Sequence, residues 1–189
     1  MLAKECGAVV LRNEKNRGYD ESLEMGFQEA CQLGADVIVT CDADGQHRPE
    51  DLIRVLEPIL QGSADVVAAL RSRRPDFGER LFAFYTKNFF GVSDPLCGLK
   101  AYTREAYMTC GPFSYLHSIG TIVLLRAIRS GKRVSFVQIT LNDRKDASRF
   151  YVRRLRGNVK VLAAFTRVFL RFLLYSEGSA RQNKAVSLE

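Results

Sequence analysis

The sequence predicts an α/β fold, a Rossmann-type and mostly parallel sheet flanked by helices. Residues 36–41, Asp-Val-Ile-Val-Thr-Cys, form a near-continuous apolar run that is typical of a central strand covered on both faces. Such runs alternate with amphipathic stretches between residues 8 and 70. Strand, helix, strand, helix and strand at this spacing indicate a sheet with right-handed crossovers.

Glycine and proline mark several boundaries of these elements. Gly34 is placed to end the helix that begins at Tyr19, and Pro49 suits the first turn of the next helix. Residues 1–7 resemble the last turn of a helix, and the first predicted strand follows directly. This suggests an α/β fold that lacks its first strand–helix unit. The remaining predicted elements are strands at 8–11, 65–70 and 133–139, helices at 81–90, 119–130 and 151–175, a turn at 93–98 and a loop at 140–148. The predicted divisions are a truncated α/β domain at 1–150, an amphipathic basic helix at 151–175 and a flexible tail at 176–189.

Composition restricts the class of protein. The net charge of +7 favours anionic partners such as phosphates, nucleotides or an acidic membrane surface. Five scattered cysteines without a Cys-x-x-Cys pair fit a reducing, cytoplasmic compartment and argue against a disulfide framework or structural zinc. No window reaches the roughly 18 apolar residues of a membrane span, and no aromatic-basic motif supports nucleic acid as a partner.

The strongest candidate site follows the run at residues 36–41. Parallel sheets bind ligands beyond the carboxyl ends of their strands, and Asp42 and Asp44 stand at such an end. Gly45 lets the backbone bend, and Gln46 adds a neutral oxygen. These hard ligands suit Mg²⁺ or Mn²⁺ bridging phosphates. The alternative is that the two aspartates only form a turn and cap the helix at Pro49.

Several segments resemble those of family-2 glycosyltransferases. Residues 36–50, Asp-Val-Ile-Val-Thr-Cys-Asp-Ala-Asp-Gly-Gln-His-Arg-Pro-Glu, resemble the metal-binding segment of the family. The Asn-x-Gly…Gly-Phe helix of the family resembles residues 16–18 with 26–27. Its acceptor-side turn resembles residues 92–102. Its late strand resembles residues 131–139. The likeness is closest to the branch of dolichyl- or polyprenyl-phosphate mannosyl- and glucosyltransferases. It implies a GT-A-like fold.

The resemblance also implies roles for individual residues. Those aligned with Asp42, Asp44 and Gln46 hold the metal and the phosphates of a nucleotide-diphosphate sugar. Those matching Arg71 and Arg80 contact the acceptor phosphate, and arginine matches phosphate oxygens well. The remaining expected substrate-binding residues are Asn88, two turns beyond Arg80, and Arg144, Ser148 and Arg149 in a loop that closes over the phosphates. For each arginine the alternative is a solvated surface charge, which we prefer for Arg73 and Arg74.

The need for a catalytic base depends on the acceptor. A phosphate acceptor is already an anion, whereas a glycan hydroxyl would need a carboxylate to remove its proton. Asp94 is the candidate base. Arg80 and Arg149 are the other two expected catalytic residues. Turn initiation before Pro95 is an equally good explanation of Asp94. We expect His47 to pack or to bond to backbone, and we assign no role to His117.

The final helix carries basic residues on one face. Their spacings of three, four, seven and four suit the surface of an anionic bilayer, so we expect peripheral contact at the inner face of the membrane. Packing on its own domain, or in a homodimer, is the alternative. The residues are Arg153, Arg156, Lys160, Arg167 and Arg171.

Some family features are missing from the sequence. The Pro-x-Tyr-Asn-Glu and Asp-Asp-Gly-Ser segments of its first two strands are absent, and Thr121, Ile122 and Ala147 depart from the residues often found there. The predicted function is metal-dependent, inverting transfer of a sugar from a nucleotide-diphosphate sugar to a polyprenyl phosphate or glycan. A catalytically inactive fragment or scaffold is the alternative.

Overall fold

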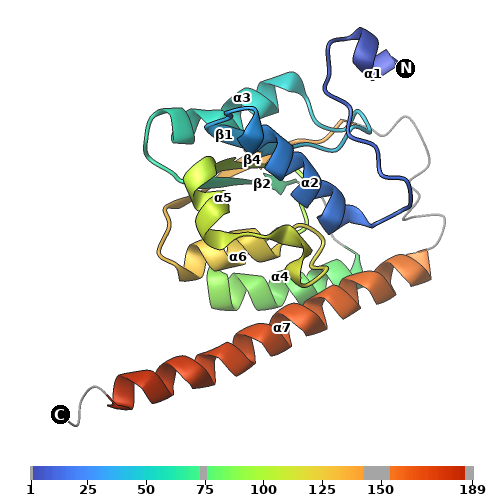
Figure 1. The fold of residues 1–189 in the computed structure, drawn as a ribbon. Coiled ribbons are helices and arrows are strands. Elements are labelled where there is room, and N and C mark those ends of the chain that lie inside the picture. The colour runs from blue at the N-terminus through green and yellow to red at the C-terminus, as the bar shows by residue number, and fades with distance from the viewer. Residues whose placement is uncertain (1, 73–75, 143–153, 186–189) are drawn as a thin grey trace.

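The computed structural model describes residues 2–72, 76–142 and 154–185 of the 189-residue chain. A sheet of four strands separates helices on its two faces, and Figure 1 shows α3 on one side of it and α4, α6 and α7 on the other. The predicted α/β architecture is therefore confirmed.

The sheet is mixed. Its strands are β1 (Val37–Thr40), β2 (Val66–Arg71), β3 (Lys100–Thr103) and β4 (Val134–Ile139), in the order β1-β3-β2-β4. Strand β3 is antiparallel to both β1 and β2, while β2 and β4 are parallel. Three strands thus share one direction, but two of the three pairings are antiparallel, which corrects the expectation of a mostly parallel sheet. Strand β3 follows the turn at 93–98 and lies between β1 and β2.

The sequence predicted a central parallel strand at residues 36–41, but β1 lies at an edge of the described sheet and pairs antiparallel with β3, so that expectation was wrong. Strand β2, with β3 and β4 as neighbours, is the strand covered on both faces. Val66 and Ala68 belong to a core shared with α2, α4, α5, α6 and α7, whereas Val67 and Ala69 belong to a second core beneath α3. All four residues are completely buried. The alternation follows from the two-residue period of a strand.

The helices begin and end near their predicted boundaries. Pro49 is the first residue of α3, and Gly91 takes a left-handed φ of 74° at the end of α4. Helix α4 begins before its predicted start because Asp76 and Glu79 form a capping box. The helices are α1 (Leu2–Glu5), α2 (Tyr19–Gln32), α3 (Pro49–Leu60), α4 (Phe77–Phe90), α5 (Arg104–Cys110), α6 (Ile122–Arg129) and α7 (Arg154–Ala185).

Two predicted elements differ from the structure. Residues 8–11 do not form a strand: Val9 is 64% exposed, and no described strand pairs with the segment. A strand needs a neighbour to satisfy its backbone groups, and apolar residues alone do not provide one. Helix α7 runs past its predicted end at Tyr175 to Ala185.

Helix α7 packs on its own domain. The ring of Phe165 lies 5.8 Å from that of Phe82 and 5.4 Å from that of Tyr85, and Phe172 lies 4.9 Å from Phe90. Figure 1 shows α7 running alongside α4. One of the alternatives for this helix, packing within the domain, is therefore confirmed for its apolar side. No helix in the described ranges is long and apolar enough to cross a bilayer.

Candidate active site

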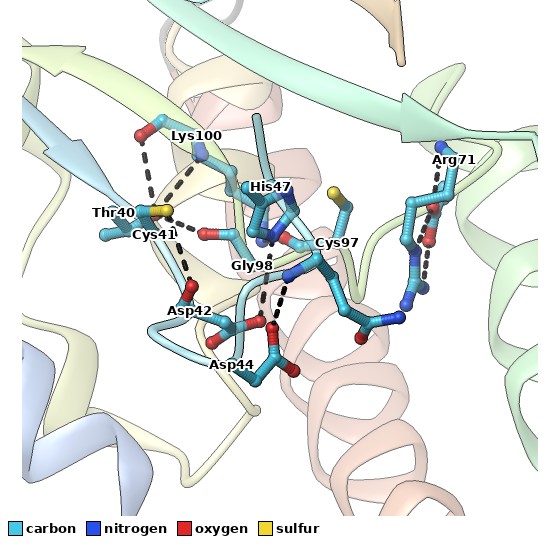
Figure 2. Close-up of polar contacts among 11 residues, drawn as sticks. Thr40, Cys41, Asp42, Asp44, His47, Arg71, Cys97, Gly98 and Lys100 are labelled. Carbon is cyan, nitrogen blue, oxygen red and sulfur yellow. Dashed lines mark hydrogen bonds and ion pairs between the residues drawn. The ribbon is translucent and has the colours of Figure 1, made fainter. Parts of the chain in front are cut away.

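The acidic turn begins where β1 ends. Gly45 takes a left-handed φ of 77°, and the amide N–H of Gln46 donates to Oδ1 of Asp44 at 3.1 Å (Figure 2). The carbonyl of Gln46 accepts from the amide of Asn142 at 2.9 Å. The turn is thus tied to the segment that leads into residues 143–153.

Asp42 lies against the backbone of Gly98. A Cβ on residue 98 would stand 2.7 Å from Cγ of Asp42, and closer still to Oδ2, so any larger residue there would require the Asp42 carboxylate to move. The Asp42 side chain remains 45% exposed, and its Oδ2 lies 3.9 Å from Nε2 of His47. The His47 side chain is 4% exposed, and its Nδ1 has no hydrogen-bond partner among the described residues. The burial of His47 thus confirms the predicted packing, whereas Nδ1 forms no hydrogen bond to the described backbone.

The turn suits a cation that is shared with a substrate. The predicted ligands Asp42, Asp44 and Gln46 all belong to it, and the half-exposed Asp42 carboxylate can still be reached from solvent. Across the parts of the chain that the structure describes, no group of three or more His, Cys, Asp or Glu side chains would enclose a metal. Two carboxylates and an amide oxygen are the hard donors that Mg²⁺ and Mn²⁺ prefer, so the residue types of the turn fit such a cation.

Arg71 and Asp94 form a buried ion pair on the far side of β3. Nε and Nη2 of Arg71 donate to the two carboxylate oxygens of Asp94 at 2.7 and 2.6 Å, and the Arg71 amide donates at 3.0 Å. The side chains are only 14% and 17% exposed. Burial raises the pKa of Asp94, but the hydrogen bonds and charge of Arg71 outweigh it and hold the pKa below its usual value. Asp94 is thus a weak base, because its carboxylate is strongly stabilised.

A cavity of about 200 Å³ opens beside this pair. It combines charged and amide groups with an apolar wall, as ligand pockets usually do. The lining residues are Leu70, Arg71, Glu79, Ala83, Ser93, Asp94, Pro95, Leu96 and Gln138.

The other predicted substrate-binding residues lie apart from this cavity or outside the description. Arg80 and Asn88 are exposed on α4, and Nδ2 of Asn88 donates to the carbonyl of Phe84 at 2.7 Å within its own helix. Neither lines the cavity. Arg144, Ser148 and Arg149 lie outside the described residues.

Lys100, at the start of β3, received no role from the sequence. Its side chain is buried at 3% exposure, and Nζ donates to the carbonyl of Cys97 at 2.6 Å. Burial lowers the pKa of Lys100, while the nearby Cys97, Asp94 and Asp42 oppose that shift. A lysine among the apolar residues of Cys-Gly-Leu-Lys-Ala-Tyr was the available signal, because buried lysines are rare.

The sequence also did not reveal Asp20, which fastens the loop before α6. This buried carboxylate accepts the amides of Ile119 and Gly120, although Ile119 has a φ of 57° that a β-branched residue seldom adopts. Thr121 Oγ1 donates to the carbonyl of Pro95 at 3.1 Å, which joins the loop to the turn that carries Asp94. Strain of this kind collects at functional sites.

Comparisons with known proteins identify the family of the chain. Residues 1–117 match the profile of glycosyl transferase family 2. A UDP-N-acetylglucosamine–dolichyl-phosphate N-acetylglucosaminyltransferase of Methanococcus voltae is 31% identical over 111 residues, which cover 52% of this chain and 44% of the relative. An undecaprenyl-phosphate 4-deoxy-4-formamido-L-arabinose transferase of Pectobacterium carotovorum is 36% identical over 109 residues, which cover 54% and 32%.

The fold has solved counterparts. One is glucosyl-3-phosphoglycerate synthase of Mycobacterium tuberculosis in complex with Mn²⁺, UDP and glucosyl-3-phosphoglycerate. It superposes with a TM-score of 0.60 at 16% sequence identity, and the match covers 87% of this chain and 62% of the synthase chain. The chain spans less than half the length of the two curated relatives described above. The profile match extends over more than half of the chain and shows that the chain belongs to glycosyl transferase family 2.

Proposed function

We propose that this chain carries out metal-dependent, inverting transfer of a sugar from a nucleotide-diphosphate sugar to a polyprenyl phosphate. The observation that carries the proposal is the pairing of two sites around β3: the half-exposed acidic turn at Asp42 and the cavity lined by Arg71 and Asp94. The curated relatives named above act on dolichyl and undecaprenyl phosphates, which supports this class of acceptor.

Asp42, Asp44 and Gln46 would hold Mg²⁺ or Mn²⁺ on the donor side. Such a cation neutralises the charge that develops on a departing diphosphate. The M. tuberculosis synthase has been solved with UDP and Mn²⁺ or Mg²⁺, which supports the use of a divalent cation in this fold. The contact between Gln46 and Asn142 supports a role for Arg144, Ser148 and Arg149 over the phosphates, since the segment carrying them begins beside the turn.

The Arg71–Asp94 pair would serve the acceptor side. Asp94 occupies Nε and Nη2 of the guanidinium, which leaves Nη1 for a phosphate oxygen. The depressed pKa of Asp94 favours an acceptor that needs no strong base, such as a phosphate, over a glycan hydroxyl. An oxygen of the acceptor phosphate attacks the anomeric carbon as the bond to the diphosphate breaks, and the anomeric configuration inverts in this single displacement.

The surface of α4 and α7 supports contact with the membrane where a polyprenyl acceptor resides. Phe77 and Phe84 lie on one stripe of α4 and are 72% and 69% exposed. On the same helix Arg80 and Lys87 are exposed, and Lys160 and Arg167 are exposed on the neighbouring α7. Apolar side chains edged by cations suit an anionic bilayer surface, so we place the protein peripherally at the inner face of the membrane. In this position Arg80 and Asn88 would meet the lipid headgroup.

Isothermal titration calorimetry with UDP-sugars and GDP-sugars, with and without Mn²⁺, tests the donor half of the proposal. We expect binding that requires Mn²⁺ and that Asp42→Asn weakens at least tenfold. The control is Asp36→Asn, which changes the same charge on a 93% exposed side chain.

Transfer to undecaprenyl phosphate and to dolichyl phosphate, followed with a radiolabelled sugar, tests the acceptor half. We expect a lipid-linked product with inverted configuration, identified by NMR of the anomeric carbon. If no nucleotide sugar binds in the presence of Mn²⁺, the proposal is wrong and the inactive alternative is favoured.

A further inference from the structure

Lys100 is a buried cation that the proposed transfer does not yet use. It lies on the strand between the two sites, with its side chain directed to the turn at 93–98 rather than to solvent (Figure 2). Within the described residues its Nζ has one hydrogen-bond partner, the carbonyl of Cys97. A neutral donor would satisfy that carbonyl at a lower desolvation cost.

The carbonyls of Cys97 and Gly98 are each held from a different strand. Lys100 Nζ on β3 donates to the first at 2.6 Å, and Thr40 Oγ1 on β1 donates to the second, also at 2.6 Å. Thr40 Oγ1 in turn accepts the backbone amide of Lys100 at 3.2 Å. The two side chains therefore fix the backbone of consecutive residues against the sheet.

That backbone is the surface on which Asp42 rests. Since a Cβ at residue 98 would overlap the Asp42 carboxylate, a small movement of Gly98 changes the room available to it. The position of Gly98 therefore controls the orientation of a proposed metal ligand.

The charge of Lys100 also links it to the two sites. Asp42 and Asp94 both stabilise its ammonium group, and Arg71 opposes it. One buried cation thus interacts with a carboxylate from each of the two sites, one on either side of β3.

We propose that Lys100 is a positioning residue, which holds Asp42 in its metal-binding orientation through the Cys97–Gly98 backbone. The inference rests on the proposed function in one respect, namely that Asp42 binds the metal. Residues that orient metal ligands typically contribute 10- to 100-fold in metal affinity.

The test compares Lys100→Met with Lys132→Met. The control removes the same charge at Lys132, which pairs with Glu105. Lys132 precedes the first residue of β4, at the end of that strand opposite to Ile139. Two quantities are measured: the backbone amide chemical shifts of the metal-free proteins by NMR, and the affinity for Mn²⁺ alone by electron paramagnetic resonance. Should Lys100→Met fail to fold, Lys100→Gln is measured in its place.

We expect the variant at position 100 to shift the amide signals of Asp42 and Gly98 and to weaken Mn²⁺ binding about tenfold. The variant at position 132 should do neither. Unchanged Asp42 and Gly98 signals, or wild-type Mn²⁺ affinity, would overturn the inference. Failure of the wild-type protein to bind a nucleotide sugar with Mn²⁺ contradicts the proposed function instead, and the metal-free NMR comparison still decides whether Lys100 positions Asp42.

Discussion

Arg71 and Asp94 face each other across the end of β2 as a bidentate ion pair, with Nε–Oδ2 and Nη2–Oδ1 distances of 2.7 and 2.6 Å. From the sequence, the two residues have separate predicted tasks: Arg71 binds a phosphate and Asp94 removes a proton. Their geometry makes them a single unit. Because the pair is largely buried, its integrity should matter for stability as well as for function.

Asp94→Asn should destabilise the protein by about 3 kcal/mol, because it leaves the buried Arg71 guanidinium without its counter-charge. The free energy of unfolding from urea denaturation measures this loss. Asp65→Asn is the matched control. It breaks the pair between Asp65 and Arg133, whose side chains are 22% and 58% exposed, and should cost clearly less. Equal losses in the two variants would contradict the view that burial makes the Arg71–Asp94 pair important.

The stabilisation by Asp94 should depend on pH. Its pKa is lower in the folded protein than in the unfolded chain, so the unfolded state binds more protons as the pH falls. The contribution is therefore complete above about pH 5 and is lost progressively below about pH 4. Urea denaturation of wild type and Asp94→Asn between pH 7 and pH 3.5 should show a difference that shrinks toward acid. A constant difference over that range would count against the depressed pKa.

Gly98→Ala should disturb the acidic turn directly. The added Cβ would overlap the Asp42 carboxylate, so we expect Mn²⁺-dependent binding of the donor to weaken at least tenfold. Gly26→Ala is the control, since a Cβ at that helical position meets nothing within 4 Å and should stabilise α2 by up to about 1 kcal/mol. Calorimetry and thermal unfolding of both variants separate the effect on the site from the effect on the fold. Wild-type donor affinity in Gly98→Ala would show that Asp42 has room to move.

Phe84→Ser should reduce binding to anionic vesicles. Phe84 is 69% exposed on α4 beside Arg80 and Lys87, and losing its ring removes apolar area from the surface proposed to touch lipid. Ile53→Ser on α3, across the sheet, is matched in exposure at 68% and should have no effect. Co-sedimentation with phosphatidylglycerol vesicles, compared with phosphatidylcholine vesicles, measures the change. Equal reductions in the two variants would rule out a specific contact through α4.

Local patterns in the sequence determined the elements around the acidic turn. The apolar run before Asp42 and the proline at Pro49 predicted strand, turn and helix in the places where the structure has them. The left-handed Gly91 likewise ends α4 as predicted. Such features depend on neighbours in the chain, whose periodicity and backbone preferences are written in consecutive residues.

Contacts between distant residues were decided only by the tertiary structure. The short β3 lacks a long apolar run, so its antiparallel insertion could not be predicted. The apolar neighbours of Lys100 hinted at its burial, but only the fold shows which groups surround its ammonium. Residues 8–11 have the apolar character of a strand but find no partner among the described strands, because pairing depends on what the fold places alongside.

The site divides in the same way. The sequence by itself predicted candidate side chains for the chemistry, since two carboxylates after a strand and an arginine at the end of the next one are visible in single segments. Only the tertiary structure decided that Arg71 is bound to Asp94 and that Gly98 supports Asp42, across separations of 23 and 56 positions. Packing and electrostatics select those partners through space, and no local pattern encodes them.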